Sequence, residues 1–142
     1  MYKYRARVNR IIDGDSVVLD IDLGFNTWIN NQSIRVYGVD TPETRTKDLD
    51  EKQRGFLAKK HVEELLPLGD FVLIKTFKDR GGKFGRILAE IINIDGINVG
   101  ESLIYNHLGV SYYGQSKHEI KQQHLENREI LILEDKLVCL IV

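Results

Sequence analysis

The sequence predicts an α+β domain in which five short, mostly antiparallel β-strands form a small closed sheet covered by three α-helices. Aliphatic and β-branched residues alternate with polar ones through the first half of the chain, between turn residues, as is typical of a strand meander. Helical spacing appears after the third strand and twice more near the end. This pattern is compatible with a five-stranded OB-fold β-barrel, and a chain of 142 residues is the size of one domain.

The expected strands share alternating or continuous apolar residues and span residues 2–12, 16–23, 33–40, 71–77 and 86–94. In the second strand, Val17 and Leu19 point to one side and Asp20 to the other, which predicts a sheet with one face in water. Between the second and third strands, residues 24–32 are either a loop or an extension of a hairpin.

The first helix is expected over residues 51–66, where apolar residues recur at helical spacing until Pro67 ends the pattern. The second and third helices are expected to begin after Asn98 and near Ser116, because each of these side chains is followed three positions later by a glutamate, as in a capping box. Residues 130–142 fit either a continuation of the third helix or two short strands around a turn.

The composition is that of an ordinary globular protein, with 42% hydrophobic and 29% charged residues. No apolar run is long enough to cross a bilayer, and the charged N-terminal residues lack the features of an export signal. We therefore expect a cytoplasmic protein for the chain as given, and a secreted one if the chain is a trimmed mature form. Cys139 has no second cysteine for an internal disulfide, and the four histidines lack the paired spacing of a zinc site, so any metal would be held by oxygen.

The net charge of −1 and the isoelectric point of about 6.4 lack the broad basic character of a protein that coats nucleic acid. Lys3, Arg5 and Arg7 nevertheless occupy alternate positions of the first strand, so one face of that strand would carry three cations. This face is either a ridge that contacts phosphates or a solvated strand face.

Carboxylates collect at two turns of the chain. Asp15 follows an Asp-Gly pair, and Asp40 and Glu43 stand on either side of a Thr-Pro pair. Because Pro42 has no N–H and biases Thr41 toward an extended backbone, the Thr41 carbonyl is a further candidate ligand. These hard oxygen donors suit Ca²⁺ or Mg²⁺. Each feature alone also has an ordinary explanation, since Asp-Gly turns are common and opposite charges often form a solvated rim.

Three segments, "IIDGDSV", "IRVYGVDTPET" and "GKFGRILAEI", resemble in the same order the signature segments of the thermonuclease family, also called staphylococcal nuclease-like domains. The resemblance extends from about residue 4 to about residue 126 and includes the helix inserted after the third strand. It implies a five-stranded OB-fold barrel with three helices. It also implies a Ca²⁺-dependent, sequence-nonspecific nuclease whose substrates are DNA and RNA and whose products carry 3′-phosphate ends.

The site residues implied by the resemblance are Asp15, Asp40 and the Thr41 carbonyl for Ca²⁺, Glu43 for the attacking water, and Arg35 and Arg86 for the phosphate. The chemistry supports such a set, because a phosphodiester is already anionic and the charge on its oxygens must be neutralised as water attacks. Arginine suits this task because its planar fork can give two hydrogen bonds to one phosphate. Glu43 has an alternative as a loop carboxylate paired with Arg45 or Lys47.

Four further residues are candidate contacts to the nucleotide. Lys83 and Phe84 lie in a Lys-aromatic-Gly-Arg segment, and Tyr112 and Tyr113 follow the second helix where the family places nucleotide-contacting tyrosines. Aromatic side chains can stack on any base, which suits a nonspecific enzyme. The alternative for these aromatic residues is packing against the rim of the barrel.

The main alternative to an enzyme is a catalytically silent module of the same fold that binds nucleic acid or a partner. The chain retains all five side chains of the implied site, and this retention favours the enzyme. We expect a monomer. The apolar tail over residues 137–142 is expected to be buried in the protein's own core, with a homodimer contact as the alternative.

Overall fold

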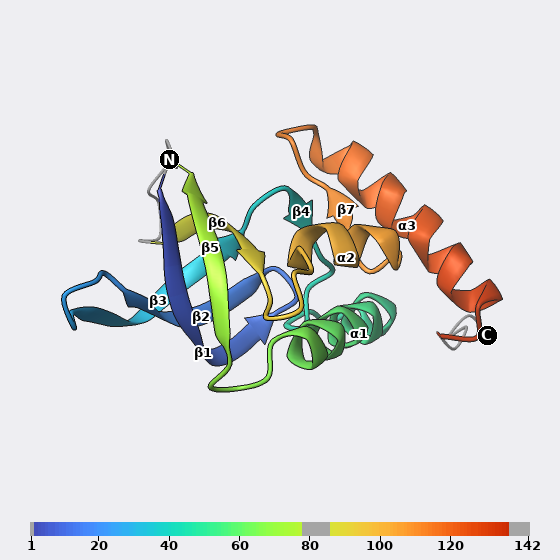
Figure 1. The fold of residues 1–142 in the computed structure, drawn as a ribbon. Helices are drawn as coiled ribbons and strands as arrows, with labels where there is room; N and C mark the ends of the chain where they lie inside the picture. Colours follow the sequence, from blue (N-terminus) through green and yellow to red (C-terminus); the bar gives the residue numbers. More distant parts are fainter. Residues whose placement is uncertain (1, 78–85, 137–142) are drawn as a thin grey trace.

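Figure 1 shows the protein as a computed structural model, which describes residues 2–77 and 86–136. Five strands form a closed barrel in the order β1-β2-β3-β6-β5, namely β1 (Lys3–Asp13), β2 (Ser16–Asp22), β3 (Trp28–Val36), β6 (Ile87–Ile92) and β5 (Phe71–Phe77). Neighbouring strands are antiparallel except for β3 and β6, which run parallel with Ile34 opposite Ile87. The predicted five-stranded barrel is confirmed.

The third predicted strand, residues 33–40, is two separate elements. Residues 28–32 belong to a hairpin with β2, and β3 ends at Val36. Gly38 then turns the chain at a φ of +81°, a left-handed conformation that glycine adopts readily. The short strand β4 (Val39–Asp40) pairs with β7 (Val110–Ser111) in a ribbon outside the barrel. The turn therefore carries Asp40 away from the barrel sheet and toward the helices.

Three helices complete the fold, α1 (Leu49–Leu65), α2 (Val99–Tyr105) and α3 (Lys117–Leu133). The side chains of Asn98 and Ser116 accept hydrogen bonds from amides three residues on, as the capping pattern predicted. Helix α1 begins earlier than predicted, because the Asp48 side chain accepts hydrogen bonds from the amides of Asp50 and Glu51. Within the described ranges, no helix has both the length and the apolar character needed to cross a membrane.

Helix α3 continues through Ile130 to Leu133 and is capped at Glu134, so the helical alternative is correct for this part of the C-terminal segment. The apolar tail, residues 137–142, lies outside the described residues.

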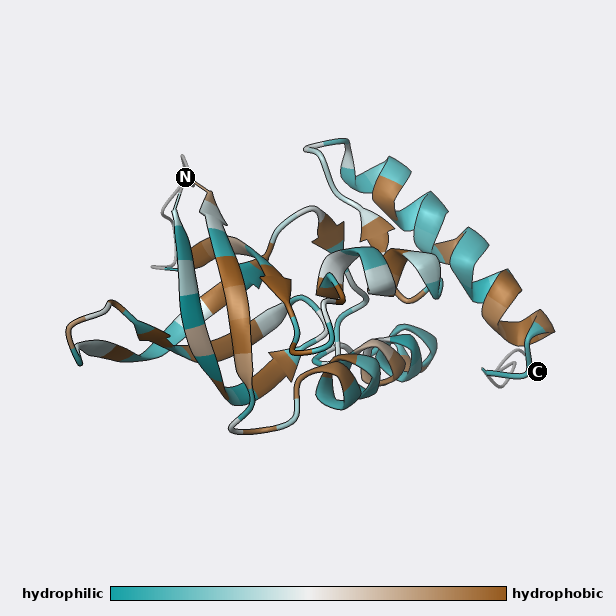
Figure 2. Ribbon diagram, in the orientation of Figure 1, coloured by the Kyte–Doolittle hydropathy of each residue, from teal (hydrophilic) through white to brown (hydrophobic). Residues whose placement is uncertain are grey.

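Helix α1 closes one end of the barrel and contributes Ala58 and Val62 to the core, and its C-cap residue Leu66 is buried there as well (Figure 1). The largest fully buried side chains include Leu19, Ile34, Ile74, Ile91 and Leu103. Full burial of such a side chain stabilises the folded state by about 1.5–3 kcal/mol relative to leaving it exposed to water. Figure 2 shows that apolar residues concentrate along the barrel strands, whereas much of α3 is polar.

The expectation of a wet face on β2 is wrong. Val18 and Asp20 are 2% and 7% exposed, although they lie on the side predicted to face water. The Asp20 carboxylate accepts hydrogen bonds from the Asn31 amide at 2.9 Å and from the Asn9 side chain at 3.2 Å, and it lies 3.6 Å from Arg7 Nη2. These contacts lower the pKa of Asp20, with the backbone hydrogen bond from Asn31 as the largest cause.

Two of the three cations predicted on one face of β1 contact other side chains on the barrel surface. Arg5 Nη2 lies 3.0 Å from Asp22 Oδ2, and the Arg5 guanidinium stands 4.8 Å from the centre of the Phe71 ring. The Arg7 guanidinium stands 5.1 Å from the centre of the Trp28 ring. These contacts favour a structural strand face over a phosphate-binding ridge.

Helices α1 and α2 are joined by a hydrogen bond between His61 Nε2 and Ser102 Oγ at 2.8 Å. Burial lowers the pKa of His61 from its ordinary value of 6.5; Glu64 raises it and Lys136 lowers it further by smaller amounts. The unfolded chain therefore binds this proton more readily than the folded protein does. The contribution of His61 to stability is present above pH 6.5 and is lost as the pH falls from there toward the lower pKa of the folded state.

We expect His61→Gln to reduce the loss of unfolding free energy between about pH 7 and about pH 5.5, measured by urea denaturation. His118→Gln on α3 is the matched control, because His118 is exposed and should leave the pH dependence as in the wild type. An identical pH dependence in wild type and His61→Gln would contradict the prediction.

Candidate active site

The candidate site forms at the barrel rim where the β1–β2 turn, the end of β3 and β4 meet. Ser16 of β2 stands opposite Arg35 of β3 in the antiparallel register, and the Val36 amide donates to the Asp15 carbonyl at 2.9 Å. This pairing places Asp15 beside Arg35, and the turn at Gly38 returns the chain to the same place.

The Arg35 guanidinium lies between two carboxylates. Its Nη1 is 3.1 Å from Asp15 Oδ2, and its Nη2 is 3.6 Å from Asp40 Oδ1. Arg35 Nη1 also donates to the Val39 carbonyl at 2.9 Å. The structure thus brings together Asp15, Arg35 and Asp40, residues that the sequence assigned to one site.

Asp15 is held by a contact that is distant in sequence. Asp15 is 9% exposed, and its Oδ2 accepts a hydrogen bond from the Thr41 amide at 3.2 Å. Its Oδ1 accepts one from the Ser16 hydroxyl at 3.2 Å. The Asp15 carboxylate therefore joins the β1–β2 turn to the segment after β4, which goes beyond the usual role of an aspartate in an Asp-Gly turn.

Close packing fixes the Glu43 loop against α1. A Cβ atom added to Gly55 of α1 would lie 2.5 Å from the Glu43 carbonyl oxygen, and one added to Gly14 would lie 2.8 Å from Ala58 Cβ and 2.9 Å from Thr41 Cγ2. Only glycine permits these two approaches. The β1–β2 turn, the Glu43 loop and α1 are therefore in direct contact.

Glu43 stands at the rim with its side chain exposed on one side. In the part of the chain that the structure describes, its carboxylate has no ion pair, so the alternative of a pair with Arg45 or Lys47 is not observed. Partial burial raises the pKa of Glu43, and the negative charges of Asp15, Asp13 and Asp40 raise it further.

The side chains present fit a hard cation with an incomplete protein shell. Asp15 and Asp40 offer carboxylate oxygens, and the buried Thr41 hydroxyl oxygen has no hydrogen-bond partner among the described residues. Within those residues, no three His, Cys, Asp or Glu side chains are grouped to hold one metal ion. Two carboxylates with neighbouring neutral oxygens suit a cation that completes its shell with water, as Ca²⁺ does.

His124 of α3 is a site residue that the sequence did not reveal. It is 9% exposed, and its Nε2 lies 2.8 Å from Asp40 Oδ2. The sequence did contain a pattern that could have revealed it, because His124, Arg128 and Leu131 recur at helical spacing. These three are the buried residues of α3. A histidine and an arginine on a buried stripe require polar partners, and Asp40 is the partner of His124.

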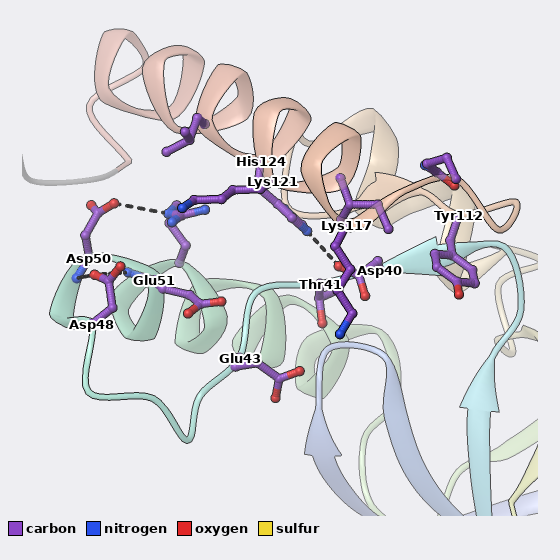
Figure 3. Close-up of a pocket in the computed structure, with 14 residues that line it drawn as sticks. Asp40, Thr41, Glu43, Asp48, Asp50, Glu51, Tyr112, Lys117, Lys121 and His124 are labelled. Carbon is purple, nitrogen blue, oxygen red and sulfur yellow. Dashed lines mark hydrogen bonds and ion pairs between the residues drawn. The ribbon is translucent and has the colours of Figure 1, made fainter. Parts of the chain in front are cut away.

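A pocket of about 540 Å³ lies between the start of α1 and α3 next to Asp40 (Figure 3). At its far side, Arg128 Nε is 2.8 Å and Arg54 Nε is 3.4 Å from Asp50 Oδ2, which joins α1 to α3. Lys121 of α3 also lines this pocket. Basic and acidic side chains therefore share its walls.

The second arginine of the predicted site lies just before the strand that neighbours β3. Arg86 immediately precedes β6, which runs parallel to β3 and pairs with it from Ile34 opposite Ile87. Lys83 and Phe84, predicted as substrate contacts, lie outside the described residues.

The two predicted tyrosines differ in their relation to the site. The Tyr112 ring centre lies 5.9 Å from the Arg35 guanidinium, its amide donates to the Gly38 carbonyl at 2.9 Å, and its side chain lines the pocket near Asp40. Tyr113 is 74% exposed and is not brought to the pocket. Only Tyr112 joins the cluster around Arg35.

Comparison with known families gives a match for residues 33–136, which is more than half of the chain, to the family described as staphylococcal nuclease homologue. The chain belongs to this family. The match includes Arg35, the segment from Asp40 to Glu43, and α3 with His124.

Two relatives of this staphylococcal nuclease homologue come from Bacillus subtilis (strain 168). One, named endonuclease YhcR, is 29% identical over 116 residues, which are 78% of this chain and 9% of the relative. The other, named endonuclease YncB, is 33% identical over 124 residues, which are 86% of this chain and 56% of the relative. The matched part of the chain thus spans less than two thirds of either relative.

We expect Gly55→Ala to destabilise the protein by about 1–3 kcal/mol, because the new methyl group would overlap the Glu43 carbonyl, and urea denaturation would measure the loss. Gly100→Ala in α2 is the matched control, since a Cβ there would lie 3.2 Å from its nearest neighbour and leave the Glu43 loop untouched. A Gly55→Ala protein as stable as Gly100→Ala would contradict the packing described for the loop.

Proposed function

We propose that this chain is a Ca²⁺-dependent, sequence-nonspecific nuclease that hydrolyses phosphodiester bonds in DNA and RNA and leaves 3′-phosphate ends. The observation that carries the proposal is the convergence of Asp15 and Asp40 on Arg35, at 3.1 Å and 3.6 Å, at the rim that holds Glu43. Family membership and the two relatives named endonucleases support cleavage over binding alone.

Asp15, Asp40 and the Thr41 carbonyl are the proposed Ca²⁺ ligands. Their oxygens match the hard donors that Ca²⁺ prefers, and Ca²⁺ tolerates an irregular shell completed by water or substrate. When bound, Ca²⁺ would supply positive charge beside the phosphate.

Arg35 and Arg86 are proposed to hold the phosphate. Arg35 is fixed before substrate binds, because it donates to the Val39 carbonyl at 2.9 Å and pairs with two carboxylates. A donor already in place stabilises developing charge without reorganisation during the reaction. Arg86 immediately precedes β6, the strand adjacent to β3, and would act on the same phosphate.

Glu43 is proposed to accept a proton from the attacking water. The water oxygen bonds to phosphorus while the bond from phosphorus to O5′ breaks, and O5′ leaves with a proton from solvent. The phosphate stays on the 3′ oxygen, which gives the 3′-phosphate product. The absence of an ion-pair partner for Glu43 among the described residues leaves its carboxylate available for water.

Cleavage of supercoiled plasmid and of single-stranded DNA tests the proposal with Ca²⁺ or with a chelator. We expect cleavage only with Ca²⁺, a rate about 10²–10⁴ lower for Glu43→Gln because the base is lost, and a rate about 10²–10³ lower for Arg86→Ala because a phosphate donor is lost. Mass spectrometry of the fragments should show 3′-phosphates.

Arg5→Ala is the matched control for the arginine variant, because Arg5 pairs with Asp22 on the barrel surface. Its cleavage rate should equal that of the wild type. Cleavage that persists in chelator, or that is unchanged in Glu43→Gln and Arg86→Ala, would exclude the proposed mechanism. Nucleic-acid binding without cleavage would favour the silent module.

His124 is proposed as a positioning residue for Asp40, since Nε2 lies 2.8 Å from Oδ2. We expect His124→Leu to raise the Ca²⁺ concentration for half-maximal cleavage by about 10- to 100-fold, as loss of a residue that orients a ligand commonly does. The rise in melting temperature that Ca²⁺ induces should likewise require a higher Ca²⁺ concentration in His124→Leu than in the wild type.

His118→Leu on the exposed side of α3 is the control, and it should leave the Ca²⁺ requirement unchanged. His124→Gln retains an N–H donor near the position of Nε2 and should recover part of the affinity. A general loss of stability in His124→Leu without any change in the Ca²⁺ requirement would show a purely structural role.

A further inference from the structure

A second hollow, of about 550 Å³, lies beside the candidate active site between the Glu43 loop and the first half of α1. We call it the basic groove, and its lining includes Arg45, Thr46, Lys47, Lys52, Phe56 and Lys59. Among the residues that the structure describes, no aspartate or glutamate lines it. In contrast, the pocket next to Asp40 has Asp48, Asp50 and Glu51 among its lining residues.

The four cations of the basic groove have no neutralising partner in residues 2–77 and 86–136. Within the described parts of the chain, none of Arg45, Lys47, Lys52 and Lys59 forms an ion pair. Other arginines of the molecule are paired, such as Arg5 with Asp22 and Arg54 with Asp50. In a protein with a net charge of −1, this groove is a local concentration of unbalanced positive charge, which a polyanion would stabilise.

The groove and the candidate catalytic rim meet at the loop that carries Glu43 and Thr44. Glu43 lines the pocket next to Asp40, and the following residue, Thr44, lines the basic groove. The Thr44 hydroxyl donates a hydrogen bond to an Asp13 carboxylate oxygen, and the Glu43 backbone packs on Gly55. The loop is thus fixed at both residues, and a strand that crosses Glu43 would pass directly into the basic groove.

Helix α1 presents an aromatic ring between two cations on this side. Lys52, Phe56 and Lys59 occupy positions i, i+4 and i+7, so they share one helix face. Phe56 is 48% exposed. An exposed ring between cations is the combination by which proteins hold single-stranded nucleic acid, with the ring stacking on a base and the cations on phosphates.

We propose that the basic groove binds the single strand of nucleic acid that extends from the scissile phosphate, with Lys52 and Lys59 on its phosphates and Phe56 against a base. The proposal rests on the nuclease function proposed above. Single-stranded nucleic acid is favoured over a duplex because a base must be unstacked to reach Phe56. Free phosphate would use the cations and leave the ring without a role.

The double variant Lys52→Gln/Lys59→Gln tests the phosphate contacts. We compare hydrolysis of a single-stranded DNA of about 16 nucleotides with that of bis(4-nitrophenyl) phosphate, a diester too small to reach the groove. The ratio of kcat/KM for the two substrates should fall about tenfold at low salt, through KM. The slope of log affinity against log salt should decrease by about 1.4, since each lost contact to single-stranded DNA contributes about 0.7.

Phe56→Ala tests the stacking, and it should weaken binding of the single strand by about 5- to 150-fold with little change in the salt slope. The charge-matched control is Lys3→Gln/Lys60→Gln, whose two exposed lysines do not line the groove. Its ratio of kcat/KM values should equal that of the wild type. Circular dichroism and melting temperature verify that each variant is folded.

Fluorescence anisotropy of a labelled single strand, measured without hydrolysis in chelator, separates the two proposals. If neither substrate is hydrolysed by the wild type but the groove variants still weaken binding, the nuclease function fails and the groove stands. Unchanged binding and unchanged ratios in both groove variants would overturn the groove. The groove would also be overturned if inorganic phosphate or polyglutamate competed for binding as well as an unlabelled single strand does. The same holds if the binding of a duplex depended equally on Phe56.

Discussion

Repulsion among carboxylates at the barrel rim is the constraint on which the placement of the surrounding elements depends. The rim carries the carboxylates of Asp13, Asp15, Asp40 and Glu43; partial burial raises the pKa of Glu43 most, and the other three carboxylates raise it further. Each compensating group comes from a different element, with Arg35 from β3, the Thr44 hydroxyl from the loop and His124 from α3. Such a concentration of negative charge opposes folding, and these contacts with groups from three elements offset it.

The sequence predicted the parts of the structure that depend on local chemistry. Strand alternation located the barrel, and the Asn98 and Ser116 caps located two helix starts, because these signals act within a few residues. The segments around Asp15 and Asp40 also placed those residues in one site, and the structure shows both beside Arg35. The motif order, rather than any single turn, carried that prediction.

Features that depend on contacts distant in sequence were missed. The β4 strand that follows the turn at Gly38 pairs with β7, which lies far along the chain. The burial of Asp20 depends on a hydrogen bond from Asn31 across the hairpin. Strand alternation reports which side of a strand a residue occupies, but not what covers that side. His124 was missed for the same reason, since its role is defined by Asp40, which lies 84 positions earlier. The charge of the whole chain likewise hid the local separation of cations from carboxylates.

The topology of the barrel also has a consequence for the order of folding. The carboxylates and Arg35 lie within the first three barrel strands and the segment that follows, whose hairpins are local in sequence. Closure requires Lys3 to meet Lys75 and Ile34 to meet Ile87, and such long loops close slowly. Arg86 reaches the strand beside Arg35 only at that step. Arg86 would therefore be placed beside the strand of Arg35 only in the completed barrel, so partly folded chains would hold Asp15, Arg35 and Asp40 without this second arginine.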